Sequence, residues 1–256
     1  DQVDGAGSGG GGGSLIEEDM QNIADKDLPK AQFMIKRMAQ QLVNSISRRY
    51  RLSKKHSKLD LRRTIRDNLR YGGTPFSLKY KSRRIQKPRL LLLCDVSGSM
   101  SRYASFVLQF IYSINSVVSH IESFVFADKI EPITPFFERK QDFDSTMLDI
   151  VNKSSQWGGG TSIAAALAGL RKNHAQVITG NTIVLIVSDT KTTNIDKAAH
   201  ELRILKRRVK NVIWLNTLPE SENDNSLTVK AFRKEVKMYP CNTLADLESI
   251  IRSKIL

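Results

Sequence analysis

The sequence predicts an α/β protein: a doubly wound, mostly parallel sheet with a helical, basic amino-terminal extension. Two observations lead to this fold class. From Pro88 onward, short apolar runs are separated by stretches of helical periodicity, which is the pattern of a parallel sheet with helices on both faces. Before Pro88, the apolar residues recur at helical spacing, and the positive charge is concentrated in the second half of this region.

Three segments are expected along the chain. Residues 1–14 read DQVDGAGSGGGGGS, a glycine-serine linker that has nothing to bury and should be disordered. Residues 15–87 form the helical and basic amino-terminal module, and residues 88–256 form the α/β domain. At 256 residues, with 40% apolar content, the chain is long enough to bury a sizeable core.

The first part of the amino-terminal module, Leu15–Arg51, is predicted to be helical, and Pro29 is expected to open its second helix. The apolar residues that recur at helical spacing are Ile23, Leu28, Phe33, Met34, Met38, Leu42, Val43 and Ile46. Such spacing is typical of amphipathic helices that bury one face.

The second part of the module is predicted to contain a helix that ends at Gly72 and Gly73, followed by a strand. One face of the helix is aliphatic and is formed by Leu59, Leu61, Ile65 and Leu69. Three side chains share one side of the strand: Phe76, Leu78 and Tyr80.

The α/β domain is predicted to alternate strands and helices. The predicted strands are Arg89–Asp95, Ile121–Ala127, Thr182–Ser188, Asn211–Asn216 and Val236–Tyr239, with a shorter edge strand at Ile130–Ile133. The predicted helices are Ser101–Ser119, Ser145–Lys153, Ser162–His174, Asp196–Arg208 and Thr243–Arg252. No internal repeat is evident.

The basic residues are concentrated in one segment. Residues 48–89 contain 16 Lys or Arg and two Asp, so this segment accounts for the whole net charge of +14. Such a segment can be a solvated surface, or it can bind an acidic protein or nucleic acid. Its aromatic residues, Tyr71, Phe76 and Tyr80, follow an alternating pattern that favours packing over base stacking. Nucleic-acid binding through the 48–89 segment therefore stays an alternative function.

The composition also bears on location. No apolar run reaches the roughly 18 to 20 residues of a membrane span, and the first residues show no signal-peptide pattern. We therefore expect a cytoplasmic chain with no membrane partner. Cys94 and Cys241 are too few for a disulfide framework or a thiolate metal site, and both should be reduced.

Polar residues gather where the predicted strands end. The first strand ends in Asp95, which is followed by Ser97 and Ser99, and a later strand is followed by Asp189. Between them, the stretch WGGGTS leads into a helix at Thr161. Because the carboxyl ends of parallel strands meet at one edge of a sheet, where ligands bind in this architecture, we expect these side chains to lie together.

These side chains all carry oxygen, and Mg²⁺ is a hard cation that prefers oxygen ligands and keeps several waters. The hydroxyls of Ser97, Ser99 and Thr161 are predicted to bind the ion, Asp95 to bind it directly or through water, and Asp189 to orient a bound water. Mn²⁺ and Ca²⁺ are alternative ions. Because one or two carboxylates compensate the ion poorly, an Asp or Glu of a partner protein can replace an exchangeable water.

The three motifs resemble the metal-ion-dependent adhesion site (MIDAS) of von Willebrand factor type A (VWA) domains, over about Pro88–Leu256. Upstream DLRRTIRDNLRYGGTPFSLKYKSRR and downstream IWLN, Ile213–Asn216, resemble the CoxE-like branch of that superfamily. Two positions depart from the pattern: Thr190 stands where glycine is common, and Thr217 where CoxE-like proteins often have proline.

The resemblance implies a Rossmann-like VWA domain whose metal ion bridges two proteins through a carboxylate supplied by the partner. CoxE-like proteins often act beside MoxR-type AAA+ ATPases in assembling or maturing other proteins. We therefore expect a non-enzymatic chaperone adaptor that works with such an ATPase in protein or metalloenzyme maturation.

Motifs of common enzymes do not occur at these positions. None of the four histidines, His56, His120, His174 and His200, lies in the three motifs. The GGGTS stretch lacks the lysine of a phosphate-binding loop, and Ser97 is not framed as G-x-S-x-G. Metal-assisted hydrolysis needs an oriented nucleophile and usually an acid or base near the ion. A metal-dependent hydrolase stays a second alternative.

Overall fold

The computed structural model describes residues 15–55, 58–59, 61–69, 77–81, 89–115, 121–139, 141–223, 225–250 and 252–253. At residues 42–55, 58, 80–81, 114–115 and 220 it describes the backbone alone. The chain divides into two compact units, one comprising Asp1–Gln40 with Pro88–Leu256 and the other Gln41–Lys87. We call them the sheet unit and the basic unit.

The sheet unit is built on a six-stranded sheet in the order β5-β4-β3-β6-β7-β8. Its strands are β3 (Arg89–Asp95), β4 (Ile121–Phe126), β5 (Ile130–Pro132), β6 (Thr182–Ser188), β7 (Asn211–Asn216) and β8 (Lys237–Pro240). All neighbours pair in parallel except the edge strand β5, which is antiparallel to β4. The predicted fold class and all six predicted strands are confirmed, with ends shifted by one residue at most.

The central strands are apolar between their end residues because helices cover both faces of the sheet. In β3, Leu91 and Leu93 belong to a core cluster that includes Leu167 and Leu202 of the helices above them. Successive side chains of a strand point to opposite faces. Leu90, Leu92 and Cys94 therefore face the other layer, where they are also buried.

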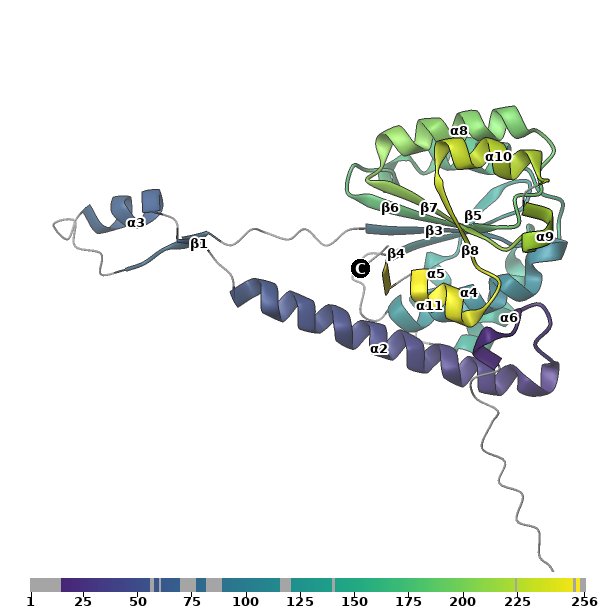
Figure 1. Ribbon diagram of the computed structural model, residues 1–256, viewed down its shortest axis with the longest axis horizontal. Helices are drawn as coiled ribbons and strands as arrows, with labels where there is room; N and C mark the ends of the chain where they lie inside the picture. Colours follow the sequence, from purple (N-terminus) through teal and green to yellow (C-terminus); the bar gives the residue numbers. More distant parts are fainter. Residues whose placement is uncertain are drawn as a thin grey trace, which may run out of the picture. The chain divides into compact units, whose positions relative to one another are not determined.

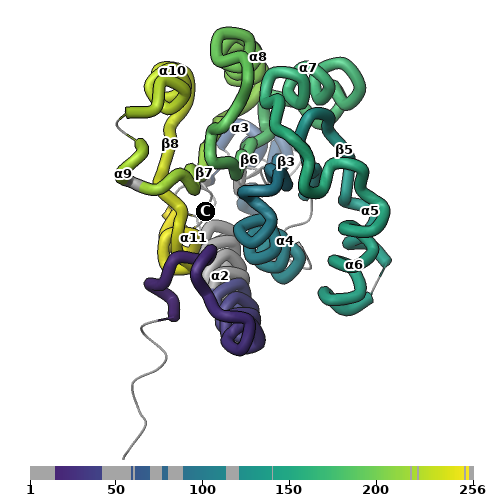
Figure 2. Tube along the Cα trace, turned by 90° about the vertical axis from the view of Figure 1, so that its right-hand side faces the viewer, coloured from purple at the N-terminus to yellow at the C-terminus, as the bar shows by residue number. Residues whose placement is uncertain are grey.

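Helices lie in two layers, one on each face of the sheet (Figures 1 and 2). One layer holds α7 (Ile163–Asn173), α8 (Ile195–Arg208) and α10 (Leu227–Glu235). The other holds α4 (Ser101–Asn115), α5 (Thr134–Phe137), α6 (Phe143–Lys153) and α11 (Leu244–Ile250), together with the first part of α2 (Leu28–Lys55). This is the doubly wound arrangement that the sequence predicts.

The first part of the predicted amino-terminal module packs within the sheet unit. Met20, Ile23 and Ile35 are fully buried, and the Met20 backbone N–H donates to the Asn242 carbonyl at 2.8 Å. The Tyr103 hydroxyl donates to Asp19 Oδ1 at 2.7 Å. The sequence predicts one module over residues 15–87, whereas the structure groups its first part, through Gln40, with the sheet.

Short helices and α10 go beyond the sequence prediction. The short ones are η1 (Asp25–Asp27), η3 (Gly98–Met100), η4 (Ala175–Val177), α5 and α9 (Glu220–Asn223). Helix α10 begins after Ser226, whose side chain accepts from the Val229 N–H, and it buries Val229 and Phe232. Its sequence LTVKAFRKE is only nine residues long, shorter than the roughly 11 to 18 residues over which helical periodicity is read.

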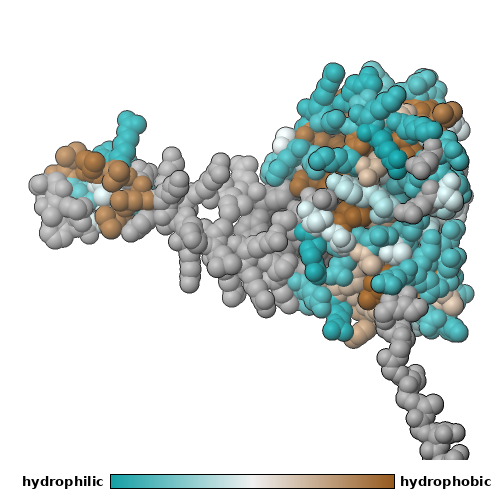
Figure 3. Space-filling model, in the orientation of Figure 1, coloured by the Kyte–Doolittle hydropathy of each residue, from teal (hydrophilic) through white to brown (hydrophobic). Residues whose placement is uncertain are grey.

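The basic unit contains the end of α2, helix α3 (Leu61–Asn68) and two short antiparallel strands, β1 (Lys58–Leu59) and β2 (Tyr80–Lys81). The predicted helix is present from Leu61 onward, whereas Leu59, which was expected on the same helical face, lies in β1. The aliphatic residues are exposed, as the brown surface around α3 shows (Figure 3). Other predictions lie outside the described residues: the linker at residues 1–14, Tyr71, Gly72, Gly73, Phe76, and the end of the helix predicted to reach Ser119. None of the helices in the described ranges combines the length and the hydropathy that a membrane span requires.

Candidate metal centre

Asp95 lies at the carboxyl end of the central strand β3 and is fully buried. Both of its carboxylate oxygens accept hydrogen bonds. The Ser97 backbone N–H donates to Oδ1 at 3.0 Å, and the Ser188 hydroxyl, from the end of β6, donates to Oδ2 at 2.7 Å. These bonds hold the carboxylate between two neighbouring strands at the edge where ligands bind in such sheets.

The environment of Asp95 disfavours its negative charge. Burial, reinforced by the negative charge of Asp189, raises the pKa of this carboxyl from 3.8 to about 6. The hydrogen bonds from Ser97 and Ser188 oppose this rise without cancelling it. A carboxylate in this position is therefore electrostatically under-compensated at neutral pH.

The Ser97 hydroxyl is a buried polar group without a partner. Its oxygen makes no hydrogen bond in the part of the chain that the structure describes. It lies near enough to Asp95 to favour the ionised carboxylate, but the geometry is not that of a hydrogen bond. Buried hydroxyls are normally paired, so an unpaired one next to a carboxylate calls for an explanation.

Ser99 and Asp189 form the second half of the site. The Ser99 hydroxyl donates to Asp189 Oδ2 at 2.7 Å, although the two residues are 90 positions apart. Asp189 is itself buried, and its Oδ1 accepts the Lys191 backbone N–H at 3.1 Å. The Lys191 ammonium lies 3.6 Å from Asp189 Oδ2.

Thr190 follows Asp189 in a backbone conformation that suits glycine. Its φ is +65°, which makes it the single non-glycine residue with positive φ among those described. A β-branched residue is strained there. This conformation turns the Thr190 N–H toward the Ser188 hydroxyl, which accepts it at 3.1 Å. The strained residue Thr190 thus begins a chain of hydrogen bonds that runs through the Ser188 hydroxyl to Asp95.

The loop that carries Thr161 packs against the loop after β3. The Gly158 N–H donates to the Val96 carbonyl at 2.8 Å, and the Ser162 N–H donates to the Ala127 carbonyl at 2.8 Å. Gly158 has a φ of +76°, so glycine is needed at this turn. Thr161, half-buried, lies between these two anchors.

Hydrogen bonds thus join four of the five predicted site residues, Asp95 with Ser97 and Ser99 with Asp189. The fifth, Thr161, is brought to the same edge by its loop. Ser188 is a site residue that the sequence analysis did not predict as one. Its position at the end of a buried strand, directly before an Asp, was the available signal.

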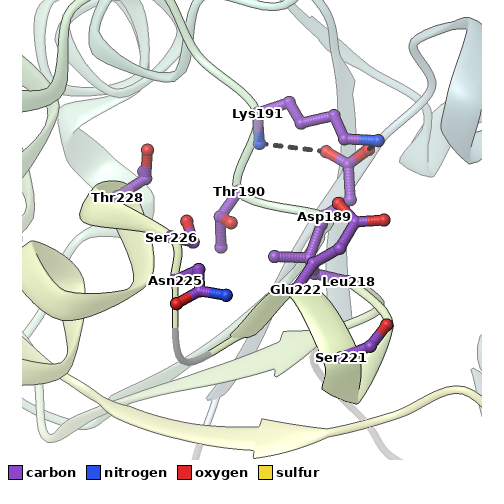
Figure 4. A pocket seen from close by; sticks show the side chains of 9 residues that line it. All are labelled: Asp189, Thr190, Lys191, Leu218, Ser221, Glu222, Asn225, Ser226 and Thr228. Atoms are coloured by element: carbon purple, nitrogen blue, oxygen red, sulfur yellow. Dashed lines mark hydrogen bonds and ion pairs between the residues drawn. The ribbon is translucent and has the colours of Figure 1, made fainter.

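A pocket of about 350 Å³ opens beside Asp189 (Figure 4). Its lining residues are Asp189, Thr190, Lys191, Leu218, Ser221, Glu222, Asn225, Ser226 and Thr228. Most of them are polar, and they come from the loop after β6 and from the region of α9 and α10.

The donor set fits a hard cation. Within the described residues, no group of three or more His, Cys, Asp or Glu side chains is arranged to hold a metal ion. The site instead has two carboxylates and serine hydroxyls, all oxygen donors, which suit Mg²⁺, Mn²⁺ or Ca²⁺. An ion in contact with the Ser97 hydroxyl would give that oxygen the partner it lacks and would balance the charge of Asp95.

The sequence model of one protein family, described as "VWA domain containing CoxE-like protein", matches residues 34–250. The chain belongs to this family. The match includes every predicted site residue and extends upstream into α2 and the basic unit. The recognition made from the three motifs is therefore confirmed, and membership in the CoxE-like VWA family supports a metal-dependent interaction role.

Solved structures similar to this CoxE-like chain include other VWA proteins. A von Willebrand factor type A protein from Catenulispora acidiphila has 13% identity and a TM-score of 0.43, covering 70% of this chain and 44% of that one. Proximal thread matrix protein 1 from the mussel byssus, with a zinc-occupied MIDAS motif, has 14% identity and a TM-score of 0.45, covering 66% and 47%.

An aerotolerance-related membrane protein from Bacteroides fragilis has 17% identity and a TM-score of 0.45, covering 66% of this CoxE-like chain and 98% of that protein. The chain spans about half the length of the mussel and Catenulispora chains. At these identities the likeness concerns the fold alone. No curated protein matches the chain in sequence.

Proposed function

We propose that this chain is a non-enzymatic interaction module that binds a partner protein through a divalent cation at the carboxyl edge of its sheet. The observation that carries the proposal is the Ser97 hydroxyl, buried without a hydrogen-bond partner in the described structure. It lies beside a buried carboxylate whose pKa is raised to about 6. A bound cation would give the Ser97 oxygen a partner and would also compensate the negative charge of Asp95.

Four residues would hold the ion: Asp95, Ser97, Ser99 and Thr161. Asp189 would act through Ser99, whose hydroxyl donates a hydrogen bond to it. The bound ion would supply an incompletely neutralised positive charge that attracts an Asp or Glu of the partner. We take Mg²⁺ as the physiological ion, because hydroxyl, carboxylate and water are the ligands it prefers. The mussel protein is described with zinc at its MIDAS motif, so the ion has to be measured.

The absence of catalysis is part of the proposal and is supported by where the described side chains lie. Of the histidines, His174 follows α7 and packs its ring against Phe124 at 4.8 Å, and His200 lies on α8. Burial raises the pKa of both cysteine thiols well above the usual range, so neither is a ready nucleophile. Neither kind of residue is among those that form the site.

For the partner we propose a MoxR-type AAA+ ATPase or a client of one, in the cytoplasm, and for the process the maturation of a protein or metalloenzyme. This part of the proposal rests on membership in the CoxE-like family, whose model covers residues 34–250. The site adds one chemical requirement, namely that the partner presents an accessible Asp or Glu side chain.

Metal binding is the first test. Isothermal titration of chelator-treated protein with Mg²⁺ and Mn²⁺ should show one saturable site that Asp95→Ala removes. The matched control is Asp196→Ala, which removes an exposed carboxylate in the first turn of α8 and should leave binding unchanged. Equal binding by wild-type protein and Asp95→Ala would overturn the proposed site.

Partner binding is the second test. The chain is coupled to beads and incubated with a purified MoxR-type ATPase, with Mg²⁺ or with chelator. We expect retention in Mg²⁺ only, and loss with Asp95→Ala but not with Asp196→Ala. Retention of the ATPase by chelated protein, or by Asp95→Ala, would contradict a metal-bridged contact.

A further inference from the structure

Helix α3 of the basic unit buries two polar residues, Thr64 and Asn68, whereas its aliphatic residues and Leu69, directly after it, are exposed. Thr64 is 4% exposed and Asn68 1%, whereas Leu61, Ile65 and Leu69 are 63%, 59% and 64% exposed. A surface helix normally does the reverse. We call the last three residues the aliphatic stripe, because their spacing of four places them along one face.

The buried polar face has a structural task. The Thr64 hydroxyl accepts the Lys79 N–H at 2.9 Å and donates to the Lys79 carbonyl at 3.3 Å. The Asn68 side-chain amide does the same with Ser77: Oδ1 accepts its N–H at 3.1 Å and Nδ2 donates to its carbonyl at 2.9 Å. These side chains pair with the backbone of residues 77–79 as a neighbouring strand would.

Because the polar face is committed to that backbone, the orientation of α3 is set and the stripe has to face outward. Isolated exposed leucines are common on protein surfaces, but a row of three on one helix marks a site of interaction. Arg62 and Arg66, both exposed, precede Ile65 and Leu69 by three positions and so lie beside the stripe on the helix surface. Arg66 lies 3.8 Å from Asp67, a distance too long for a strong ion pair.

The charge of the basic unit determines what can cover the stripe. Residues 41–87 contain 15 Lys or Arg and two Asp, a net charge of +13, which leaves +1 for the rest of the chain. A second copy of the basic unit would be repelled, and the sheet unit offers no opposite net charge. An acidic molecule is attracted.

The aliphatic stripe limits which kind of acidic molecule can bind to this surface. Aliphatic side chains offer no stacking surface to bases, so they add nothing to nucleic-acid binding. Helices that lie in lipid surfaces present a broad apolar face with Trp or Phe, which the two turns of α3 lack. A protein segment with aliphatic anchors and surrounding carboxylates matches both the stripe and its arginine border.

We infer that the aliphatic stripe of α3 is a docking surface for an acidic, amphipathic segment of a partner protein. This surface does not use the metal centre, so the inference can be tested independently of the proposed function. Together, the two surfaces would let one chain hold two proteins, one by a carboxylate on the ion and one by an apolar contact.

The test uses the full chain and labelled 16-residue peptides in fluorescence anisotropy. The probe peptide has Leu at helical i, i+4 spacing and Glu elsewhere. One control peptide replaces Glu by Lys, and the other replaces Leu by Ser. We expect saturable binding of the probe alone, at least tenfold weaker for the triple variant Leu61→Ser, Ile65→Ser, Leu69→Ser, since about 1.4 kcal/mol of lost burial suffices.

The matched control variant is Phe33→Ser, Leu148→Ser, Leu227→Ser, which removes three equally exposed apolar side chains of the sheet unit and should bind the probe as wild type does. Asp95→Ala and chelator should also leave probe binding intact. Far-UV circular dichroism checks that the triple variant of the stripe is folded. If that variant is unfolded, Leu61→Asn and Ile65→Asn are tested singly in the same assay.

Several outcomes would overturn the inference. These are equal binding of the probe by folded stripe variants, equal binding of the Lys peptide, and no saturable binding of the probe at all. Binding of phosphatidylserine vesicles or of a single-stranded RNA that the stripe substitutions weaken tenfold would reassign the surface to lipid or nucleic acid.

Discussion

The Ser188 hydroxyl donates to Asp95 Oδ2 at 2.7 Å, joining the ends of two adjacent strands across 93 positions of sequence. Ser188 in turn accepts the Thr190 N–H at 3.1 Å. The orientation of the central carboxylate thus depends on a residue that is not itself an expected ligand. Residues that orient a metal ligand usually affect affinity almost as strongly as the ligand does.

Replacing Ser188 by Ala should weaken Mg²⁺ binding about tenfold, because Asp95 loses a donor that both orients it and favours its ionised form. Isothermal titration at pH 7 measures this. The matched control is Ser123→Ala, which removes another buried serine hydroxyl, one without a hydrogen-bond partner in the described structure. Equal losses in the two variants would show that the effect is not specific to Asp95.

The raised pKa of Asp95 predicts how the stability of the metal-free protein depends on pH. The folded chain binds a proton at this group more tightly than the unfolded chain, since the pKa rises from 3.8 to about 6 on folding. The stabilisation that proton binding at Asp95 contributes to the free energy of unfolding is therefore present below pH 4 and is lost as pH rises through about 6. The full change is about 3 kcal/mol.

Asp95→Asn should remove that dependence. In urea denaturation with chelator at pH 4, 5, 6 and 7, the variant should gain on the wild type as pH rises and be the more stable protein at pH 7. The difference between the two curves isolates this group from other carboxyls. Parallel curves would mean that Asp95 titrates in the folded protein as it does in the unfolded chain.

Thr190→Gly should raise the free energy of unfolding by about 1 kcal/mol, because glycine adopts positive φ without the strain of a β-branched residue. Urea denaturation measures the change. Thr192→Gly is the matched control and should lower stability, because φ at Thr192 is negative and its hydroxyl accepts the Ile163 N–H at 3.2 Å. A loss of stability in both variants would contradict strain at Thr190.

Lys191→Ala should strengthen Mg²⁺ binding about threefold at low salt, because the ammonium group 3.6 Å from Asp189 repels a cation held near that carboxylate. The Lys191 side chain is 59% exposed, so the gain should shrink as salt is added. Titration at two salt concentrations measures both effects. Lys197→Ala, on the exposed side of α8, should change neither.

Local patterns in the sequence were enough to predict the sheet. Strands such as Thr182–Ser188 are apolar between their two end residues because both faces are covered, and the sequence alone shows that pattern. Helix α10 was missed because its nine residues are fewer than the roughly 11 to 18 over which helical periodicity is read. The position of Leu15–Gln40 could not be predicted either, since Met20 and Ile23 form hydrogen bonds with Asn242 and Arg102, which lie far along the chain.

The sequence by itself determined the fold class, the family and four residues that hydrogen bonds join in two pairs at one edge, because each depends on residue types at short spacing. Only the tertiary structure decided that Ser188 holds Asp95, that the Ser97 hydroxyl is left unpaired, and that α3 turns its leucines outward. Those features depend on which distant backbone groups satisfy each polar side chain, and no local pattern encodes that choice.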